Sequence, residues 1–164
     1  MKNCFLLLIF LFLGCGSESA EPPRRARAPF IEGFRLLHTR SGITVWRLEA
    51  KKSLKEDTRI RMENPRIHFF KAEKVSAELS SKIAFINEED ESMRLEGEVE
   101  VRDYERSTEL YLDELRWDPA QRKFISDSQV RKITPQAVIT GKGLVADEGW
   151  NEVTILENVE VEGK

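Results

Sequence analysis

Cysteine is almost absent from this chain of 164 residues: the only two, Cys4 and Cys15, fall within the first fifteen positions. This scarcity excludes a fold held together by disulfides, and it excludes a zinc site built on cysteine. A surplus of positive charge is also lacking, since 26 Lys and Arg residues face 29 Asp and Glu residues. The protein is therefore not a generally basic nucleic-acid binder, and nucleic acid is not among its expected partners.

Long hydrophobic runs are missing as well. The longest, residues 5–13, holds nine apolar residues behind Lys2. As a helix it would measure about 14 Å, less than half of the ~30 Å hydrocarbon core of a bilayer. A short apolar segment behind a positive residue is typical of a secretory signal peptide. Gly14-Cys15 then resembles the bacterial lipobox, so we predict a signal peptide over residues 1–14 and a lipid anchor on Cys15. An ordinary signal peptide or a short uncleaved anchor are the alternatives.

Residues 15–31 contain few apolar side chains and include Pro22, Pro23 and the cluster Arg24-Arg25-Ala26-Arg27. Such a composition is typical of a flexible linker, so the folded domain is expected to cover residues 32–164. Close to a lipid anchor, the arginines could rest on anionic head groups at ~1 kcal/mol each. The alternative is a solvated linker whose charge has no specific role.

Alternation of apolar and polar residues with a period of two dominates the rest of the chain and predicts an all-β fold. In residues 93–102, the side chains of Leu95, Gly97, Val99 and Val101 point one way and the charged residues between them point the other. Similar runs are separated by turn signals, a spacing that fits a sandwich, a barrel or a stacked meander and leaves no room for βαβ crossovers. These runs cover residues 44–50, 66–69, 82–85, 137–140 and 153–161.

Other segments are harder to assign. Residues 51–58 are polar and are expected to connect two strands, and Gly141-Lys142-Gly143 is expected to form a turn. Residues 107–117 fit a helix or a pair of strands equally well. Residues 95–101 also resemble residues 156–161 with one residue deleted, a weak repeat that favours a stacked sheet.

The residues expected to face the interior are apolar. They could form a packed, dry core or line a groove, and the pattern alone leaves both open. The predicted inward-facing residues are Trp46, Leu48, Ile67, Phe69, Ile83, Phe85, Leu95, Val99, Val101, Leu115, Trp117, Val138, Val159 and Val161.

Catalytic motifs are missing. The chain has no Gly-x-Ser-x-Gly elbow, no phosphate-binding loop, no His-Glu-x-x-His and no nucleophilic cysteine. His38 and His68 are isolated, and the acidic residues 88–91 lack the spacing of a calcium loop. Trp46 and Trp117 could stack on a sugar, but an alternating strand favours core positions for them. The chain is therefore predicted not to be an enzyme and to need no cofactor or metal.

Several short motifs follow one another in a set order between residues 33 and 162. They are Trp46-x-Leu48-x-Ala50, Leu95-x-Gly97-x-Val99-x-Val101, Leu115-x-Trp117, Phe124-Ile125-Ser126, Val130-x-x-Ile133, Gly141-x-Gly143-Leu144-x-Ala146-Asp147 and Leu156-x-Asn158-Val159-x-Val161. In this order and spacing they resemble the LptC family, the single-pass periplasmic component of the lipopolysaccharide-export bridge, and the related OstA-like β modules.

The resemblance implies a twisted antiparallel β-jellyroll, open at both ends, with an apolar groove in which the inward-facing residues bind the acyl chains of lipid A. It also implies an inner-membrane ABC transporter complex as a partner, and a soluble periplasmic OstA-like protein docked on the last strand through Val153, Ile155, Val159 and Val161. The expected location is the periplasm, with the chain attached by Cys15 to a membrane, the inner one more than the outer. Members usually carry a transmembrane helix, whereas lipid anchoring is expected here, so regulation through that helix is not carried over.

Two other functions stay open. A lipid-anchored envelope scaffold, with a dry sandwich core and no lipid cargo, would have the same pattern. A hydrolase of envelope glycans is disfavoured, because no acid/base pair of carboxylates stands out.

Overall fold

A computed structural model describes residues 30–164, so the predicted signal peptide, the anchor at Cys15 and most of the linker lie outside the described residues. The described part is all β, as predicted, and no helix in it is long and apolar enough to cross a membrane. The first strand begins at Phe30, earlier than the domain start expected at residue 32. The strands are β1 (Phe30–Arg40), β2 (Ile43–Glu56), β3 (Arg59–Glu63), β4 (Arg66–Lys71), β5 (Lys74–Ser80), β6 (Ile83–Asn87), β7 (Met93–Asp103), β8 (Thr108–Asp118), β9 (Lys123–Ile133), β10 (Ala137–Asp147) and β11 (Val153–Gly163).

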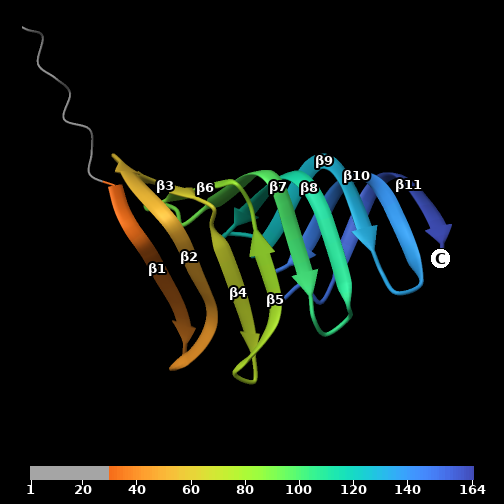
Figure 1. Cartoon of the computed structure of the whole chain (residues 1–164), viewed down its shortest axis with the longest axis horizontal. Coiled ribbons are helices and arrows are strands. Elements are labelled where there is room, and N and C mark those ends of the chain that lie inside the picture. Colours follow the sequence, from red (N-terminus) through yellow and green to blue (C-terminus); the bar gives the residue numbers. More distant parts are fainter. Residues whose placement is uncertain (1–29) are drawn as a thin grey trace, which may run out of the picture.

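These strands form one antiparallel sheet with a simple order. β2 pairs with β3 and with β4 in a single register, since Lys52 opposes Glu63 and Glu49 opposes Arg66. β3 and β4 are therefore one long strand interrupted at Asn64, and β5 and β6 form a second interrupted strand in the same way. The described chain is thus a meander of long rungs, β1, β2, β3/β4, β5/β6 and β7 to β11, each hydrogen-bonded to the next. Figure 1 shows the rungs stacked side by side from β1 to β11.

The rungs bend near their middles, and the bends line up. Several rungs have a residue with positive φ at the bend, and the register shifts there between each successive pair of strands from β7 to β11. An extra residue in one strand bends and twists that strand, so aligned irregularities fold the sheet along one crease. The residues with positive φ at the bends are Gly33 (67°), Asn64 (50°), Gly97 (74°), Glu98 (50°), Gly143 (76°) and Asn158 (51°).

The weak internal repeat coincides with two of these bends. Aligning residues 95–97 (Leu-Glu-Gly) with residues 156–158 (Leu-Glu-Asn) places Gly97 and Asn158 at the same repeat position. Both residues have left-handed backbone angles, which glycine and asparagine adopt most easily. The repeat therefore specifies the crease in β7 and in β11.

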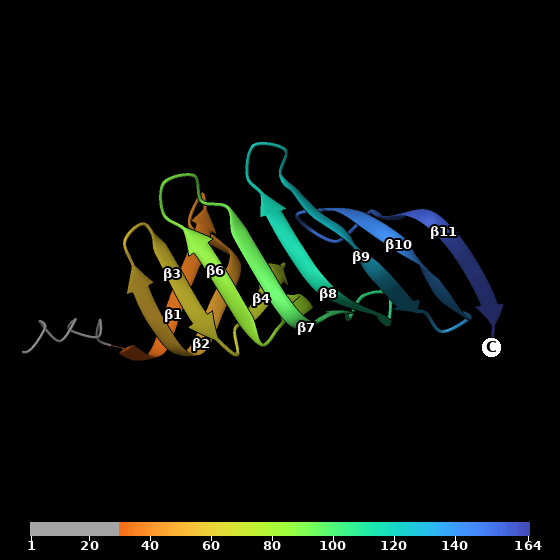
Figure 2. The same ribbon diagram turned by 90° about the horizontal axis from the view of Figure 1, so that it is seen from above.

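The crease folds the sheet into two layers that pack face to face (Figure 2). The first layer contains β4, β5 and the rung segments aligned with them, and the second contains β3, β6 and the segments aligned with those. The ring of Phe69 in β4 lies 5.9 Å from the ring of Phe124 in β9, although these strands are not hydrogen-bonded to each other. The prediction of a twisted antiparallel β-jellyroll built as a stacked meander is confirmed. Within residues 30–164, β1 pairs only with β2 and β11 only with β10, so both ends of the described sheet are open.

Two local predictions were wrong, and one ambiguity is resolved. Most of residues 51–58 continue β2 rather than connecting strands, because their polar side chains alternate with the buried Ser53 and the segment pairs with β3. Gly141-Lys142-Gly143 lies inside β10, where the glycines allow the crease instead of a chain reversal. The ambiguous residues 107–117 form most of β8, held by ladders to β7 and β9.

Candidate functional site

A row of directly opposed side chains crosses the inner face of the first layer from β1 to β11. Antiparallel partners share a face, and nine rungs at ~4.8 Å spacing give a row about 38 Å long. Its central members are at most 1% exposed, whereas Leu36 at one end is 38% exposed and Val161 at the other is 67% exposed. Lys132 is the one charged member. The row is Leu36, Leu48, Ile67, Leu79, Val101, Leu110, Lys132, Ile139 and Val161.

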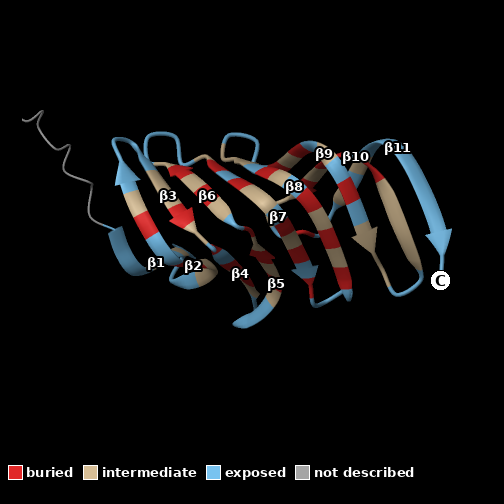
Figure 3. Cartoon of the chain, turned by 45° about the horizontal axis from the view of Figure 1, so that its top comes forward, coloured by how far each residue is buried: buried red, intermediate tan, exposed pale blue. Residues whose placement is uncertain are grey.

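The second layer presents a matching apolar row to the interior. Figure 3 shows buried positions gathered on the middle rungs, whereas β1 and β11 are largely exposed. The interior is therefore closed along its centre and apolar at both of its open ends. The second row is Ile60, Ile86, Met93, Trp117, Phe124, Ala146 and Val153.

Most of the residues predicted to face inward do so, and they belong to one cluster or pack against it. Trp46 and Trp117 are half-buried at its margin, and the others are buried. Their predicted role in lipid binding stays a prediction. The residues placed inside are Trp46, Leu48, Ile67, Phe69, Leu95, Val99, Val101, Leu115 and Trp117.

The prediction was wrong for Ile83 and Phe85, which face the outside of the second layer. Their neighbours Ala84 and Ile86 are buried instead. Residues 83–86 are four apolar residues in succession, so the pattern cannot say which pair faces inward. Packing determines which pair faces inward. Ala84 lies opposite Leu95, whose large side chain already fills the interior there, so the small alanine fits on the inner face.

The strands near the C-terminal edge differ from the prediction in a similar way. Val138 lies on the outer face, because its partner Ile133 opposes Glu109, the neighbour of the inward-facing Leu110. Val159 and Val161 lie on the inner side of β11 but are exposed, because nothing in the described chain covers the first layer at this end. Of the predicted docking residues, Val153 and Ile155 are half-buried against the core, so the exposed ones are Val159 and Val161.

An open space of about 370 Å³ lies between the layers near β1. Ligand sites typically measure ~300–1,000 Å³ and have mostly apolar linings. Leu36, Trp46 and Phe69 line this space from the first layer, and Met93 and Trp117 line it from the second.

Two larger hollows, of about 830 and 1080 Å³, lie outside the layers. They are lined largely by charged and polar side chains, among them Glu98, Glu100 and Arg131 in the first and Arg94 and Arg116 in the second. A hydrocarbon chain gains little from such surroundings. The smaller apolar space is therefore the candidate site.

Three charged residues form a hydrogen-bonded group at one rim of this cavity. Glu148, in the β10–β11 loop, accepts hydrogen bonds from Arg40 at the end of β1 (3.3 Å) and from Arg122 in the β8–β9 turn. Burial alone would raise the pKa of Glu148, but the hydrogen bonds from Arg122 and Arg40 outweigh burial and lower it. The carboxylate therefore stays ionised and links the first layer to the second.

Neither histidine forms part of a reactive group. His38 stacks on Trp46 with ring centroids 5.2 Å apart, and Nε2 of His68 lies 3.2 Å from a carboxylate oxygen of Glu78. Within residues 30–164, no group of three or more histidine, cysteine, aspartate or glutamate side chains could hold a metal ion.

Sequence reasoning missed Trp150, the largest fully buried side chain of the described chain. It lies in the β10–β11 loop, and its indole stacks on Phe124 at 4.7 Å between centroids and meets the edge of Phe69 at 6.4 Å. The residue therefore connects the two layers. A tryptophan directly after Glu148-Gly149, in an otherwise polar turn, was the signal that could have pointed to it.

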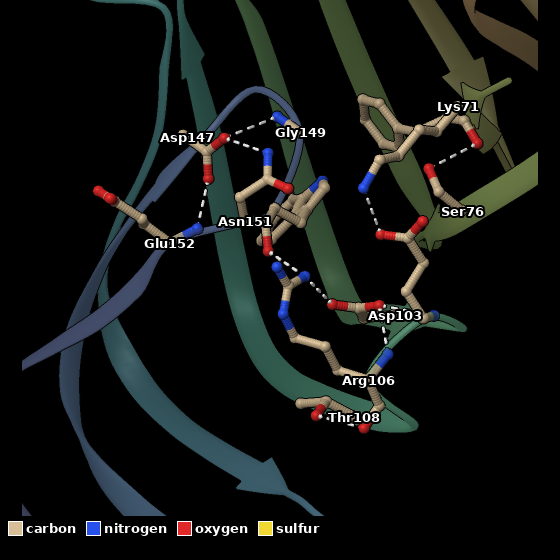
Figure 4. A network of polar contacts seen from close by, with 12 residues as sticks. Lys71, Ser76, Asp103, Arg106, Thr108, Asp147, Gly149, Asn151 and Glu152 are labelled. Carbon is tan, nitrogen blue, oxygen red and sulfur yellow. Dashed lines mark hydrogen bonds and ion pairs between the residues drawn. The ribbon is translucent and has the colours of Figure 1, made fainter.

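Two hairpin tips hold this tryptophan in place (Figure 4). Nη1 of Arg106, in the β7–β8 turn, donates to the backbone oxygen of Trp150 at 3.3 Å and to Oδ2 of Asp103 at 2.7 Å. On the other tip, the carboxylate of Asp147 accepts hydrogen bonds from the backbone nitrogen of Glu152 and from Nδ2 of Asn151. The hydrogen bond from Arg106 to Trp150 thus joins two hairpins through residues that lie 44 positions apart in the chain.

A bent β-meander with an apolar interior and two unpaired edges within residues 30–164 is a β-jellyroll open at both ends. The chain belongs to the family described as lipopolysaccharide-assembly, LptC-related, whose model matches residues 6–162. Among solved structures it is similar in fold to LptH of Pseudomonas aeruginosa, the LptA homologous periplasmic component of the lipopolysaccharide transport device. The TM-score is 0.54 at 12% identity, over 71% of this chain and 93% of LptH. No individually curated protein matches the sequence.

Proposed function

We propose that the protein is a non-enzymatic transfer module that receives lipopolysaccharide in the periplasm and passes it to the next β-jellyroll. Family membership and the fold shared with LptH, itself a component of the lipopolysaccharide transport device, support this role. The observation that carries it is the apolar cavity between the layers, which continues into the inner row of the first layer, and that row reaches both open edges.

The cavity suits the acyl chains of lipid A. Burying hydrocarbon gives ~0.8 kcal/mol per CH₂, so a chain of 12–14 carbons gains on the order of 10 kcal/mol in a fully apolar site. Trp46 and Trp117 line the cavity as half-buried aromatic surfaces on opposite layers. A chain inserted from the β1 end would contact both.

The open edges support transfer from module to module. An unpaired edge strand is a template for strand addition by another chain. Because the inner row ends at the exposed Leu36 on β1 and the exposed Val161 on β11, a second β-jellyroll paired to either edge would lengthen that row. In the proposal, an inner-membrane ABC transporter complex delivers lipopolysaccharide at the β1 side, and a soluble periplasmic OstA-like protein docks at β11.

The proposal includes a lipid anchor on Cys15, after removal of residues 1–14, that attaches the module to a membrane, the inner one in preference. Residues 16–29 would then be the tether between the anchor and β1. Mass spectrometry of the purified protein tests this: a mature N-terminus at Cys15 carrying acyl chains supports the anchor, and an unmodified cysteine contradicts it.

Site-specific photo-crosslinking tests the groove. A photoreactive phenylalanine analogue at Trp46 is expected to label lipopolysaccharide in cells. The same analogue at Phe85 is the matched control, because Phe85 is also a half-buried aromatic residue but lies on the outer face. Equal labelling at both positions would contradict a groove between the layers.

One observation favours the second candidate, an envelope scaffold without lipid cargo: the centre of the interior is filled by the protein's own side chains. Native mass spectrometry of protein extracted from membranes without harsh detergent separates the two functions. Co-purified lipopolysaccharide supports the transfer module, and its absence together with failed crosslinking at Trp46 supports the scaffold.

A further inference from the structure

The β10–β11 loop places a large apolar side chain across the interior. Trp150 is 2% exposed and lies between Phe124 of the second layer and Phe69 of the first. Phe69 and Phe124 also line the 370 Å³ cavity. The indole therefore packs between the two layers next to the cavity, on the side of the β7–β8 and β10–β11 hairpin tips.

Two local features of Trp150, its backbone conformation and its indole nitrogen, are energetically unfavourable in this position. Its φ is 59°, in the left-handed region that bulky residues rarely adopt. Its indole Nε1 is buried and has no hydrogen-bond partner. A buried donor without a partner is rare in native proteins, and each exception calls for an explanation.

The polar contacts that retain Trp150 come from its own loop and from outside it. Its backbone nitrogen donates to the carbonyl oxygen of Asp147 at 3.0 Å, a turn bond that is not part of the sheet ladders. Arg106 donates to the Trp150 carbonyl oxygen at 3.3 Å, and the adjacent Glu148 is held by Arg40 and Arg122. These are polar contacts of exposed arginines, which exchange readily with water. None of the hydrogen bonds to Trp150 belongs to a sheet ladder, so displacement of the indole would leave the ladders on either side intact.

We propose that the indole of Trp150 is a displaceable clasp, meaning a side chain that blocks the apolar interior until lipid arrives. Without lipid, the indole fills the space between Phe69 and Phe124. While lipid moves from the cavity toward β11, an acyl chain takes the place of the indole. This inference rests on the proposed transfer function and assigns the position at which passage is controlled. When the indole leaves, the backbone strain is relieved and Nε1 reaches water, while the acyl chain takes over the contacts with Phe69 and Phe124.

Crosslinking on both sides of the clasp tests the proposal in cells that express the full chain. Labelling of the photoreactive analogue at Trp46 shows that lipopolysaccharide has entered the cavity. Labelling of the analogue at Val161 shows that lipopolysaccharide has passed Trp150 and reached β11. Trp150→Ala is expected to raise the ratio of labelling at Val161 to labelling at Trp46 severalfold. Trp150→Phe should lie between Ala and the wild type, and Tyr104→Ala, an exposed aromatic residue of the neighbouring tip, should leave the ratio unchanged.

The outcomes separate the two proposals. No labelling at Trp46 or Val161 in the wild-type background overturns the transfer function and this inference with it. Labelling at Trp46 with an unchanged or reduced ratio in Trp150→Ala overturns the clasp alone.

A second measurement covers the case in which Trp150→Ala fails to fold. The full chain, labelled with 5-fluorotryptophan, is placed in phosphatidylcholine nanodiscs with or without lipid A, and Trp150→Phe identifies the Trp150 fluorine signal. Lipid A is expected to move this signal toward that of a solvent-exposed tryptophan. A signal that stays in place while those of Trp46 and Trp117 shift would contradict displacement.

Discussion

Asp147 and Glu152 fasten the two ends of the β10–β11 loop to each other. Oδ1 of Asp147 accepts a hydrogen bond from the backbone nitrogen of Glu152 at 2.6 Å, and the backbone nitrogen of Asp147 donates to the Glu152 carbonyl oxygen at 3.2 Å. Oδ2 of Asp147 also accepts from Gly149 and Asn151. One carboxylate thus sets the shape of the loop that carries Glu148 and Trp150.

Replacing this carboxylate should loosen the loop. Asp147→Ala is expected to lower the free energy of unfolding by about 1–3 kcal/mol, because it leaves loop donors without their acceptor. Thermal unfolding followed by circular dichroism measures the effect. Asp127→Ala, which removes an exposed carboxylate paired only with Arg116, is the control and should change stability by less than ~0.5 kcal/mol. Equal effects of the two variants would show that Asp147 does not organise the loop.

The same residue predicts a dependence of stability on pH. Burial alone would raise the pKa of Asp147, but the hydrogen bonds from Glu152, Asn151 and Gly149 lower it overall. Between the lowered pKa and the unfolded value near ~3.9, the unfolded chain binds more protons, so the free energy of unfolding rises with pH in that window. The stabilisation is complete above the unfolded pKa and is lost as the pH falls through the folded one.

Asp147→Asn should therefore flatten the loss of stability below about pH 4 relative to the wild type. Urea unfolding at a series of pH values from neutral to acidic measures the slope. Identical slopes for the two proteins would mean that this carboxylate does not contribute to acid sensitivity.

The crease makes a prediction at Gly141. A Cβ at this position would lie 2.5 Å from Cγ2 of Ile155 and 2.9 Å from the backbone oxygen of Glu157. Gly141→Ala is therefore expected to lower the free energy of unfolding by about 1–3 kcal/mol through overpacking against β11. Gly163→Ala, where a Cβ would meet nothing within 4 Å, is the control and should be close to neutral. Urea denaturation compares them, and a neutral Gly141→Ala would show that β11 shifts without cost.

The cavity makes a prediction about ligand affinity. Leu36→Glu places a carboxylate at the half-exposed end of the inner row, so the fold should persist while an acyl chain would have to desolvate the charge. The affinity for lipid A is expected to fall at least about tenfold, the equivalent of ~1.4 kcal/mol. Ile43→Glu adds the same charge at an exposed residue outside the cavity lining and should bind like the wild type. Equal binding by both variants would place the ligand elsewhere.

The class of fold follows from the local pattern of residues along the chain. Where polar residues alternate strictly with apolar ones, as in residues 93–102, only one face can be buried, and the strand and its inner face follow from the pattern. The short motifs shared with the LptC family are also local, so they can be recognised without the fold. The same holds for the lack of catalytic motifs. The family match over residues 6–162 confirms the resemblance drawn from those motifs.

Other features depend on packing between distant segments, which the local pattern does not specify. Residues 83–86 are apolar on both faces, so packing opposite Leu95, not periodicity, buried Ala84 and turned Phe85 outward. Trp150 reaches Phe69 and Phe124 only because the crease folds the layers together, and no local signal encodes a contact between residues so distant in the chain. Alternation is a property of neighbouring residues, whereas the closing of the interior depends on which distant segments the folded sheet brings face to face.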